Sequence, residues 1–477
     1  MAQLAGLSLL ASAYCGLLMA LGNRPFEDST PLGFVFNDMA FRMLQGRFDI
    51  DPEIIAFEGF VRDGRTYAYF GVLPALMRMP LIPFVDLRQV DVTRISMWGA
   101  CVVGALASAS AVGTALRAAA PGPFRDLLET RLKLLAVFSG PPILLAFQNG
   151  PYAEAIAWAW AFASIFVALG LQGLTAQGGF TVATLFAMAA AAGLCLLTRA
   201  TTALSLYISL GLLLAWLLWG ALRSAPSIGR IFEARFLVPS GTLLVFIVAA
   251  GFVNWARWGD PLVAADMRLQ IHMVEIFPER LARLEEYGLF DIRRLGHGIS
   301  YYFFPIWILY VDGDFPFRPR VSELFDALEL PPSSFFFSDP LNLALSGLGI
   351  ASLACGVRGM PRLGALALMA GLCVAPAMML VGWYMAFRYR VEFAPLFTTL
   401  VCIGAIHWTA RARSWSEAQR RRAARLVVML FLAQIAGAHL QSLASAILPP
   451  GYAFHHMSGP VGTLFMDCLR SDCPRPD

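Results

Sequence analysis

Apolar runs of about twenty residues recur along the chain, and they constrain its fold more than any other feature. A helix of that length spans the roughly 30 Å hydrocarbon core of a bilayer. Hydrophobic residues make up 58% of the chain and charged residues 14%, whereas soluble domains carry about 25% charged residues. A surface so poor in charge must face lipid over most of its area. We therefore expect an all-α, multi-pass membrane protein whose residues 1–477 form a single transmembrane domain.

About eleven transmembrane helices are expected. Their approximate ranges are 3–22, 92–116, 133–148, 153–173, 180–198, 202–222, 237–256, 340–357, 363–383, 392–410 and 426–447. The first run follows only Met-Ala-Gln and lacks the basic segment of a signal peptide, so we expect it to be retained as a helix. None of the intervening segments is long enough to be a separate catalytic domain.

Basic residues gather in alternate loops, and this arrangement predicts the orientation in the membrane. The basic loops are 117–133, 223–235, 358–362 and 411–425. All four fall on one side in the eleven-helix count, which the positive-inside rule identifies as cytoplasmic. We therefore expect a protein of the cytoplasmic (inner) membrane with a cytoplasmic N-terminus. The other side then receives 23–91 and 257–339, expected to form an extracytoplasmic cap, and the tail 448–477.

The first long loop contains two segments with local structure. Residues 36–46 have apolar side chains at helical spacing and predict an amphipathic helix at the membrane interface. Residues 71–84 are apolar but interrupted by prolines, which favours a second interfacial or re-entrant element. Between them, the charges of 47–65 are expected to be mostly solvated loop charges, with a turn at Asp63-Gly64.

Several classes of function find little support. The chain has no P-loop, which argues against an ATP-driven pump, and no basic face with interleaved aromatics, so no nucleic-acid partner is expected. Six of the eight cysteines lie in apolar runs, and none has zinc-site spacing. Cys468 and Cys473 flank a polar stretch of the tail, where a disulfide and a pair of free thiols are equally compatible with the sequence.

Two acidic residues are candidate catalytic groups on the expected extracytoplasmic side. Asp38 could act as a general base on an acceptor hydroxyl, or it could cap a helix. Glu154 follows a very short loop, so it must lie near the same membrane surface. It could share the base role, or it could be a charge favoured by the dipole of its helix. Two converging carboxylates could also hold a divalent cation, although no metal ligands are assigned.

Arginines and tyrosines supply candidate substrate-binding groups. Arg388, Tyr389 and Arg390 lie in a short extracytoplasmic loop, where guanidinium groups suit a phosphate; pairing with Glu392 or with lipid headgroups is the alternative. Arg199 is a similar case. Tyr67 and Tyr69 could line a sugar site or belong to an aromatic belt, and His297 is expected to be structural.

Six stretches, taken in order, resemble the motifs of the GT-C superfamily of membrane glycosyltransferases. They are Phe36-Asn37-Asp38 through Leu44-Gln45-Gly46-Arg47; Arg65 through Tyr69 with Gly71, Pro74 and Pro80; Pro151 through Glu154; Leu197-Thr198-Arg199; Asn254 through Arg257 with Gly259 and Pro261; and Arg388-Tyr389 with Glu392 and Pro395. The resemblance spans most of the chain. It departs from the family pattern at the first acidic motif, where Asn37 stands beside Asp38 in place of paired acidic residues.

The resemblance implies transfer of a sugar from a polyprenyl-phosphate donor to a glycan or lipid acceptor on the extracytoplasmic face. Asp38 would deprotonate the acceptor, assisted by Glu154. Arg199, Arg257 and Arg388 would hold the leaving phosphate, and Tyr69 and Tyr389 would contact substrate. No cofactor is assigned, a divalent cation is left open, and the remaining partners are membrane lipids.

Two other functions compete with the glycosyltransferase. A flippase or transporter for a lipid-linked glycan would need charges buried within the bundle. A non-catalytic scaffold of the cell envelope would tolerate Asp38→Asn. The gathering of charges in extracytoplasmic loops favours the enzyme.

Overall fold

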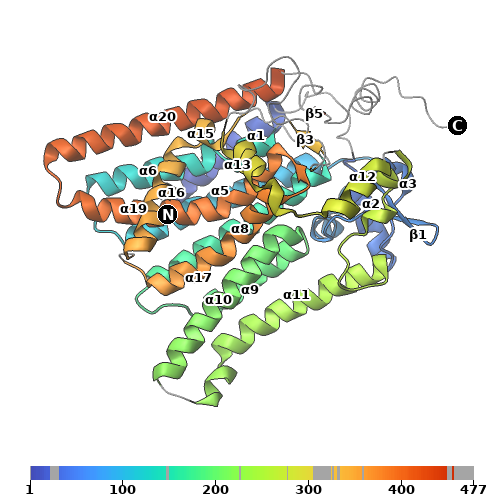
Figure 1. The fold of residues 1–477 in the computed structure, drawn as a ribbon, viewed down its shortest axis with the longest axis horizontal. Helices are drawn as coiled ribbons and strands as arrows, with labels where there is room; N and C mark the ends of the chain where they lie inside the picture. Colours follow the sequence, from blue (N-terminus) through green and yellow to red (C-terminus); the bar gives the residue numbers. More distant parts are fainter. Residues whose placement is uncertain are drawn as a thin grey trace.

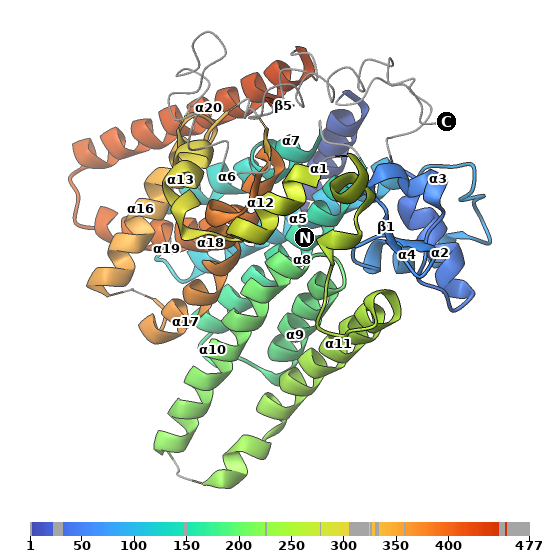
Figure 2. The ribbon, with the colours of Figure 1, turned by 45° about the vertical axis from the view of Figure 1, so that its right-hand side comes forward.

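The computed structural model describes residues 2–21, 32–146, 150–224, 227–276, 278–304, 324, 327–329, 333–356, 359–447 and 454–455. Long helices form a bundle, and a layer of short helices and strands covers one end of it (Figures 1 and 2). Cys468, Cys473 and most of the tail lie outside the described residues, so the predictions for them are not addressed.

Seven described segments are long and apolar enough to cross a membrane. They are α5 (Thr93–Arg117), α8 (Pro151–Thr175), α10 (Ala200–Ser224), α11 (Ala234–Trp258), α17 with α18 (Arg362–Leu372 and Val374–Val381), η8 with α19 (Phe387–Phe393 and Ala394–Ala412), and most of α20 (Glu417–Ile447). Three shorter apolar helices accompany them, namely α1 (Ala2–Leu21), α9 (Val182–Leu196) and α16 (Pro340–Cys355). The prediction of an all-α, multi-pass bundle is confirmed, whereas the count of eleven spans stays a prediction.

The helix predicted over 133–148 is wrong as a single element. The chain forms α6 (Pro123–Phe138), breaks, and resumes as α7 (Pro141–Ala146). Gly140 has φ +71°, and Pro141 has no N–H and disfavours helical geometry at the residue before it. The predicted basic loop 117–133 is also largely helical, because Lys133 and Arg125 pair with Glu129 along one face of α6.

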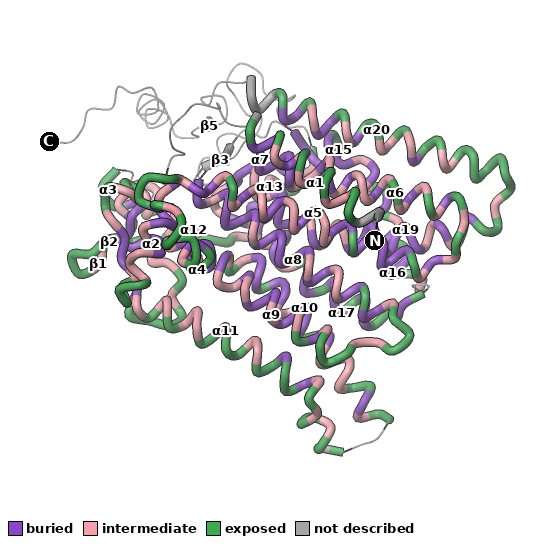
Figure 3. Tube along the Cα trace, turned by 180° about the vertical axis from the view of Figure 1, so that it is seen from behind, coloured by how far each residue is buried: buried purple, intermediate pink, exposed green. Residues whose placement is uncertain are grey.

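Burial distinguishes the centre of the bundle from its edge. In the most apolar window of α8, 78% of the residues are buried, whereas in that of α11 only 11% are. Figure 3 shows α11 as a largely exposed helix at the margin. Since the side chains of α11 are strongly apolar, its free surface is suited to lipid.

Close backbone contact holds α16 against α19. A Cβ placed at Gly404 would overlap the carbonyl oxygen of Leu345, and one at Gly349 would overlap that of Leu400. Small residues of this kind let two membrane helices approach closely enough to pack backbone against backbone.

Replacing Gly404 by Ala is expected to destabilise the protein by about 1–3 kcal/mol, because overpacking forces the two helices apart. The thermal unfolding midpoint in detergent measures the effect. Gly347 lies on the same helix α16, and a Cβ added there would meet no atom within 4 Å, so Gly347→Ala is the matched control. Equal midpoints for both variants would contradict the close packing.

The layer at the end of the bundle comes from two parts of the chain. The first contains α2 (Val35–Leu44), α3 (Pro52–Ile55), η1 (Ala56–Glu58), β1 (Phe60–Arg62), β2 (Arg65–Tyr67), α4 (Leu73–Arg78) and η2 (Met79–Leu81). The second contains η4 (Met267–Leu269), the π-helical turn η5 (His272–Ile276), α12 (Pro278–Tyr287), η6 (Ile292–Arg294) and α13 (Leu295–Phe303). The amide of Ile271 donates to the carbonyl of Gly59, 2.9 Å away, and joins the two parts.

The predictions for the first loop hold in outline. The helix expected over 36–46 is α2, and the proline-broken segment 71–84 forms α4 and η2. Asp63 and Gly64 both have positive φ, as a tight hairpin between β1 and β2 requires. The expectation of solvated charges fails for Asp49, which is buried against Arg42 and Arg47.

A small three-stranded sheet completes the described structure. Its order is β4 (Tyr384–Met385), β3 (Ala327–Glu329), β5 (Phe454–His455), with β3 parallel to β4 and antiparallel to β5. The short helix α15 (Phe335–Ser338) precedes α16.

The basic connections lie away from the layer of short elements. Figure 1 shows the junction of α19 with α20 and that of α10 with α11, which carries η3 (Ile228–Phe232), at the far ends of the bundle from α2, α3 and α12. The arrangement matches the sidedness predicted from the arginines. The orientation in the membrane itself stays a prediction.

Candidate functional site

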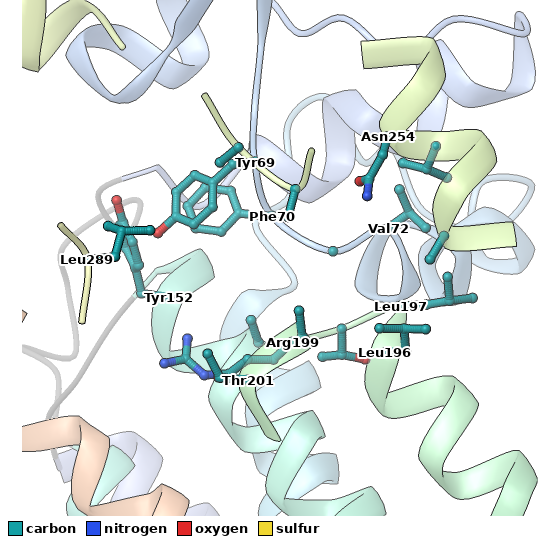
Figure 4. Close-up of a pocket in the computed structure, with 18 of the residues that line it drawn as sticks. Tyr69, Phe70, Val72, Tyr152, Leu196, Leu197, Arg199, Thr201, Asn254 and Leu289 are labelled. Atoms are coloured by element: carbon teal, nitrogen blue, oxygen red, sulfur yellow. The ribbon is translucent and has the colours of Figure 1, made fainter. Parts of the chain in front are cut away.

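A cavity of about 320 Å³ lies where the end layer meets the bundle. Its wall comes from the segment after β2, the start of α8, the turn between α9 and α10, the end of α11 and the segment between α18 and η8. Most of the lining is aliphatic or aromatic, with a few polar groups that converge on the space (Figure 4). This combination is typical of a ligand site.

The segment after β2 reaches the cavity by docking on the turn between α9 and α10. The amide of Leu73 donates to the carbonyl of Leu197, at 2.9 Å. A Cβ at Gly71 would overlap the carbonyl oxygens of Leu197 and Thr198, so glycine is required for this approach. The contact explains how Tyr69 and Arg199 come to line one cavity although they are far apart in sequence.

Arg199 enters the cavity wall from the residue just before α10. Its Nε donates to Glu392, which also accepts from Thr202 Oγ1 at 2.5 Å and Thr201 Oγ1 at 3.3 Å. The guanidinium lies 5.1 Å from the ring centre of Tyr389. Glu392 and Tyr389 therefore fix the plane of the guanidinium, and its charge stays beside the cavity.

Arg257 reaches the same cavity from the last turn of α11. One terminal nitrogen donates to the carbonyl of Phe70 at 2.8 Å, and Nε has no hydrogen-bond partner. Within the described part of the chain no carboxylate lies within ion-pair distance of Arg257, although the residue is only 3% exposed. A buried, unpaired charge is costly, so the position suits an anionic ligand.

The turn that follows α11 is built by the motif around Arg257. Gly259 has φ +76° and ends the helix in the left-handed region. Asn254 Nδ2 donates to the carbonyl of Pro261 at 3.2 Å and closes the turn. Ala264 and Ala265, which follow this turn, also line the cavity.

Arg388 lies beside the cavity among aromatic rings. Its guanidinium carbon is 5.3 Å from the ring centres of Tyr152 and Tyr389 and 5.7 Å from that of Tyr384, all three of which line the cavity. Cation–π contacts of this kind place positive charge near the space without neutralising it.

A chain of hydrogen bonds leads from the cavity into the end layer. Tyr69 and Tyr152 both line the cavity, with their ring centres 6.2 Å apart. Tyr152 Oη donates to Glu58 Oε2 at 2.7 Å, and Gln270 Nε2 donates to the same oxygen at 3.0 Å. Burial raises the pKa of Glu58, and the bond from Tyr152 and the charges of Arg280 and Arg388 oppose that rise.

Sequence reasoning missed Glu58, because it stands among charges expected to be solvated. Two of its neighbours along the chain, Phe57 and Phe60, are aromatic. That apolar setting for a single carboxylate was the available signal.

Asp38 lies in a different depression on the end layer, also lined by Asn37, Phe41, Arg42 and Arg88. Arg42 Nε donates to its carboxylate at 2.7 Å, and the amide of Asp51 does so at 2.8 Å. The alternative that Asp38 caps a helix fails for α2, since the N-cap residue of α2 is Phe34 and no side chain caps it; the backbone amide that Asp38 binds belongs to Asp51, just before α3. Asp38 does not line the cavity that holds the arginines.

Glu154 is fully buried in the first turn of α8. Arg78 donates to both of its oxygens, at 2.7 and 2.9 Å, and Ser96 Oγ donates at 2.5 Å. Arg78 also donates from Nε to Asn37 Oδ1 at 2.7 Å. The first-loop motif, through Asn37, and the second-loop motif, through Glu154, are thus brought together by their shared hydrogen-bond donor, Arg78.

This arrangement does not fit a divalent cation. Asp38 and Glu154 share no partner, and the guanidinium of Arg78 takes the position between Asn37 and Glu154 where a cation would sit. Among the described residues no group of three or more His, Cys, Asp or Glu side chains is placed to hold a metal.

Arg390 is buried in the bundle, away from Arg199. It donates to Asp339 at 2.8 Å, Ser338 at 2.6 Å and Gln441 at 3.3 Å. The alternative in which Glu392 neutralises Arg390 is therefore wrong, because Glu392 pairs with Arg199. The pairing of Asp339 with Arg390 was not predicted, because a single aspartate before an apolar helix is also typical of a helix N-terminus.

No family model and no curated protein matches the sequence. Among solved structures, the chain is similar to the oligosaccharyltransferase AglB from Archaeoglobus fulgidus in complex with an inhibitory peptide and a dolichol-phosphate, with 12% identity and a TM-score of 0.47 over 93% of this chain and 56% of that one. It is also similar to ArnT from Cupriavidus metallidurans bound to undecaprenyl phosphate, with 14% identity and a TM-score of 0.40 over 96% and 77% of the two chains. The present chain thus spans about half the length of the archaeal oligosaccharyltransferase.

Proposed function

We propose that this protein is a GT-C-type membrane glycosyltransferase, which moves a sugar from a polyprenyl-phosphate donor to a glycan or lipid acceptor at the extracytoplasmic face. The observation that carries the proposal is the cavity beneath the end layer. Two arginines line it, Arg257 has no acidic partner among the described residues, and aromatic and aliphatic side chains form most of the remaining wall.

The cavity suits a phosphate joined to both a sugar and a lipid. Arg199 and Arg257 supply guanidinium groups for phosphate oxygens, and Tyr69 and Tyr389 supply flat rings and hydroxyls for a sugar. Ala250 and Val253 extend the wall along α11, whose outer surface is open and apolar. A lipid-linked donor is thereby able to enter from the bilayer.

In the proposed reaction, an acceptor oxygen attacks the anomeric carbon of the sugar. The bond between that carbon and the phosphate oxygen breaks, and the electron pair stays with the phosphate. Arg199 and Arg257 stabilise this growing charge. The base role predicted for Asp38 and the assisting role predicted for Glu154 stay predictions, and neither side chain lines the cavity.

A flippase or transporter for a lipid-linked glycan is the second candidate. The buried Arg390–Asp339 pair favours it, because it places charges inside the helical bundle. That pair is internally satisfied and extends its hydrogen bonds to Ser338 and Gln441, which accounts for it as a structural element.

The test is transfer by the purified protein in detergent, with undecaprenyl-phosphate glucose and undecaprenyl-phosphate mannose as donors and a cell-envelope lipid extract as acceptor. Release of undecaprenyl phosphate with a sugar-modified acceptor is expected. Asp38→Asn, compared with wild type, tests the base prediction, since equal rates would contradict it. No transfer from either donor, together with movement of the lipid-linked sugar across vesicles, would favour the flippase and overturn the enzyme.

A further inference from the structure

Asp38, Glu58, Glu154 and Glu392 are among the described carboxylates at the end of the bundle that carries the end layer, and their partners differ. Asp38 pairs with Arg42, Glu154 with Arg78 and Glu392 with Arg199. A guanidinium in direct contact stabilises the charged carboxylate and so weakens it as a base. Each of these three carboxylates is thus in direct contact with its own arginine.

Glu58 is the exception among them. Its hydrogen bonds come from neutral donors, the hydroxyl of Tyr152 and the amide of Gln270. The positive groups that face it, Arg280 and Arg388, act from a greater distance, and burial outweighs them. A carboxylate in this setting has more affinity for a proton than one bonded to an arginine.

The route from the cavity to Glu58 is continuous. Tyr152 has one proton, and it donates that proton to Glu58. Tyr152 itself lines the cavity, so the group that donates to Glu58 borders the space for the substrate. Figure 4 shows the ring of Tyr152 at the cavity wall.

We propose that Tyr152 and Glu58 form a relay that takes the proton from the acceptor during sugar transfer; the relay rests on the proposed glycosyltransferase function. The acceptor O–H bond breaks as its oxygen bonds to the anomeric carbon. That proton passes to the oxygen of Tyr152, and the proton of Tyr152 passes to Glu58. The leaving phosphate keeps the electron pair of the broken bond.

Tyr152 is the catalytic residue of this relay, because it borders the space for the substrate. Glu58 acts through Tyr152 and is half-buried, so after each transfer it releases its proton to water. Asp38 then has no part in proton transfer, and its pairing with Arg42 serves to fold the end layer.

The experiment compares Glu58→Gln with Glu53→Gln, an exposed carboxylate on the same segment. With the donors named above, Glu58→Gln is expected to lower kcat by about 10²–10⁴-fold, the usual contribution of a base. Glu53→Gln keeps the wild-type rate. Binding of undecaprenyl phosphate is measured by how far the lipid raises the thermal unfolding midpoint of the protein. This binding should be unchanged in both variants, which separates loss of the base from loss of the fold.

The pH profile gives a second readout. The wild-type rate should fall as pH drops through the pKa of Glu58, which burial holds above the ordinary value of about 4.3 for Glu. Tyr152→Phe and Glu58→Gln should both abolish this acid limb, and Asp38→Asn should keep it. His272 is a further titratable group near this site, where it contacts Arg280 and lies beside Phe57, so His272→Gln should also keep the limb.

The outcomes separate the two proposals. Suppose that the wild type transfers sugar. If Glu58→Gln is equally active, or if the acid limb is lost in Asp38→Asn or His272→Gln and kept in Glu58→Gln, the relay is overturned and the glycosyltransferase function stands. A wild type that transfers sugar from no lipid-phosphate donor would overturn the proposed function itself.

Discussion

Replacing Arg199 by Gln should lower kcat/KM for sugar transfer by about 10²–10³-fold, the usual cost of removing one charge-stabilising donor from an active site. The guanidinium is held against Tyr389 and by Glu392, so it is positioned before the phosphate leaves. Preorganised charge of this kind stabilises the transition state without reorganisation. Steady-state release of undecaprenyl phosphate measures the effect.

The variant has a second consequence that must be separated from the first. Without Arg199, the carboxylate of Glu392 is left buried with only Thr201 and Thr202 as donors, which costs stability. The double variant Arg199→Gln with Glu392→Gln removes that charge. It should recover the thermal midpoint and remain inactive, whereas recovery of activity as well would contradict a phosphate-binding role for Arg199. Arg223→Gln, at the exposed far end of α10, is the matched control and should be silent.

Much of the architecture could be predicted because lipid imposes a simple rule on sequence. Long apolar runs become helices, and the described structure has one along each predicted span except two. Gly140 and Pro141 interrupt the run 133–148, and 363–383 is divided into α17 and α18. The amphipathic pattern of 36–46 and the turn at Asp63-Gly64 are local signals, so a single sequence contains them in full.

The cavity was predictable in part. Tyr69, Arg199, Arg257 and Tyr389 come from four separate loops, and all of them line one space. Sidedness alone was enough to place them at the same end of the bundle. Arg388 lies behind three of the lining rings.

The partners of the carboxylates could not be predicted, because they depend on which loops touch. Nothing local links Glu154 to Arg78, which is 76 positions away. One signal was nevertheless present. Arg78 stands alone in the apolar stretch 71–84, and a buried arginine needs a carboxylate partner.

That partnership leads to the largest stability effect expected in the protein. Arg78→Met should destabilise the fold by about 3–5 kcal/mol, the usual cost of leaving one member of a buried ion pair uncompensated. The side chains of Arg78 and Glu154 are 2% and 0% exposed, so solvent does little to screen the remaining charge. Arg88→Met, an exposed arginine of the same loop, is the control and should change the thermal midpoint little.

The double variant Arg78→Met with Glu154→Gln distinguishes a structural pair from a catalytic carboxylate. Removing both charges should recover most of the stability, since the two substitutions act on one interaction and are not additive. If Glu154 only anchors α8 to the first loop through Arg78, the rescued double variant should also transfer sugar. A double variant that is stable and binds undecaprenyl phosphate but does not turn over would instead support the assisting role predicted for Glu154. The buried geometry, with both oxygens of Glu154 taken by Arg78 and one also by Ser96, leads us to expect the active, rescued protein.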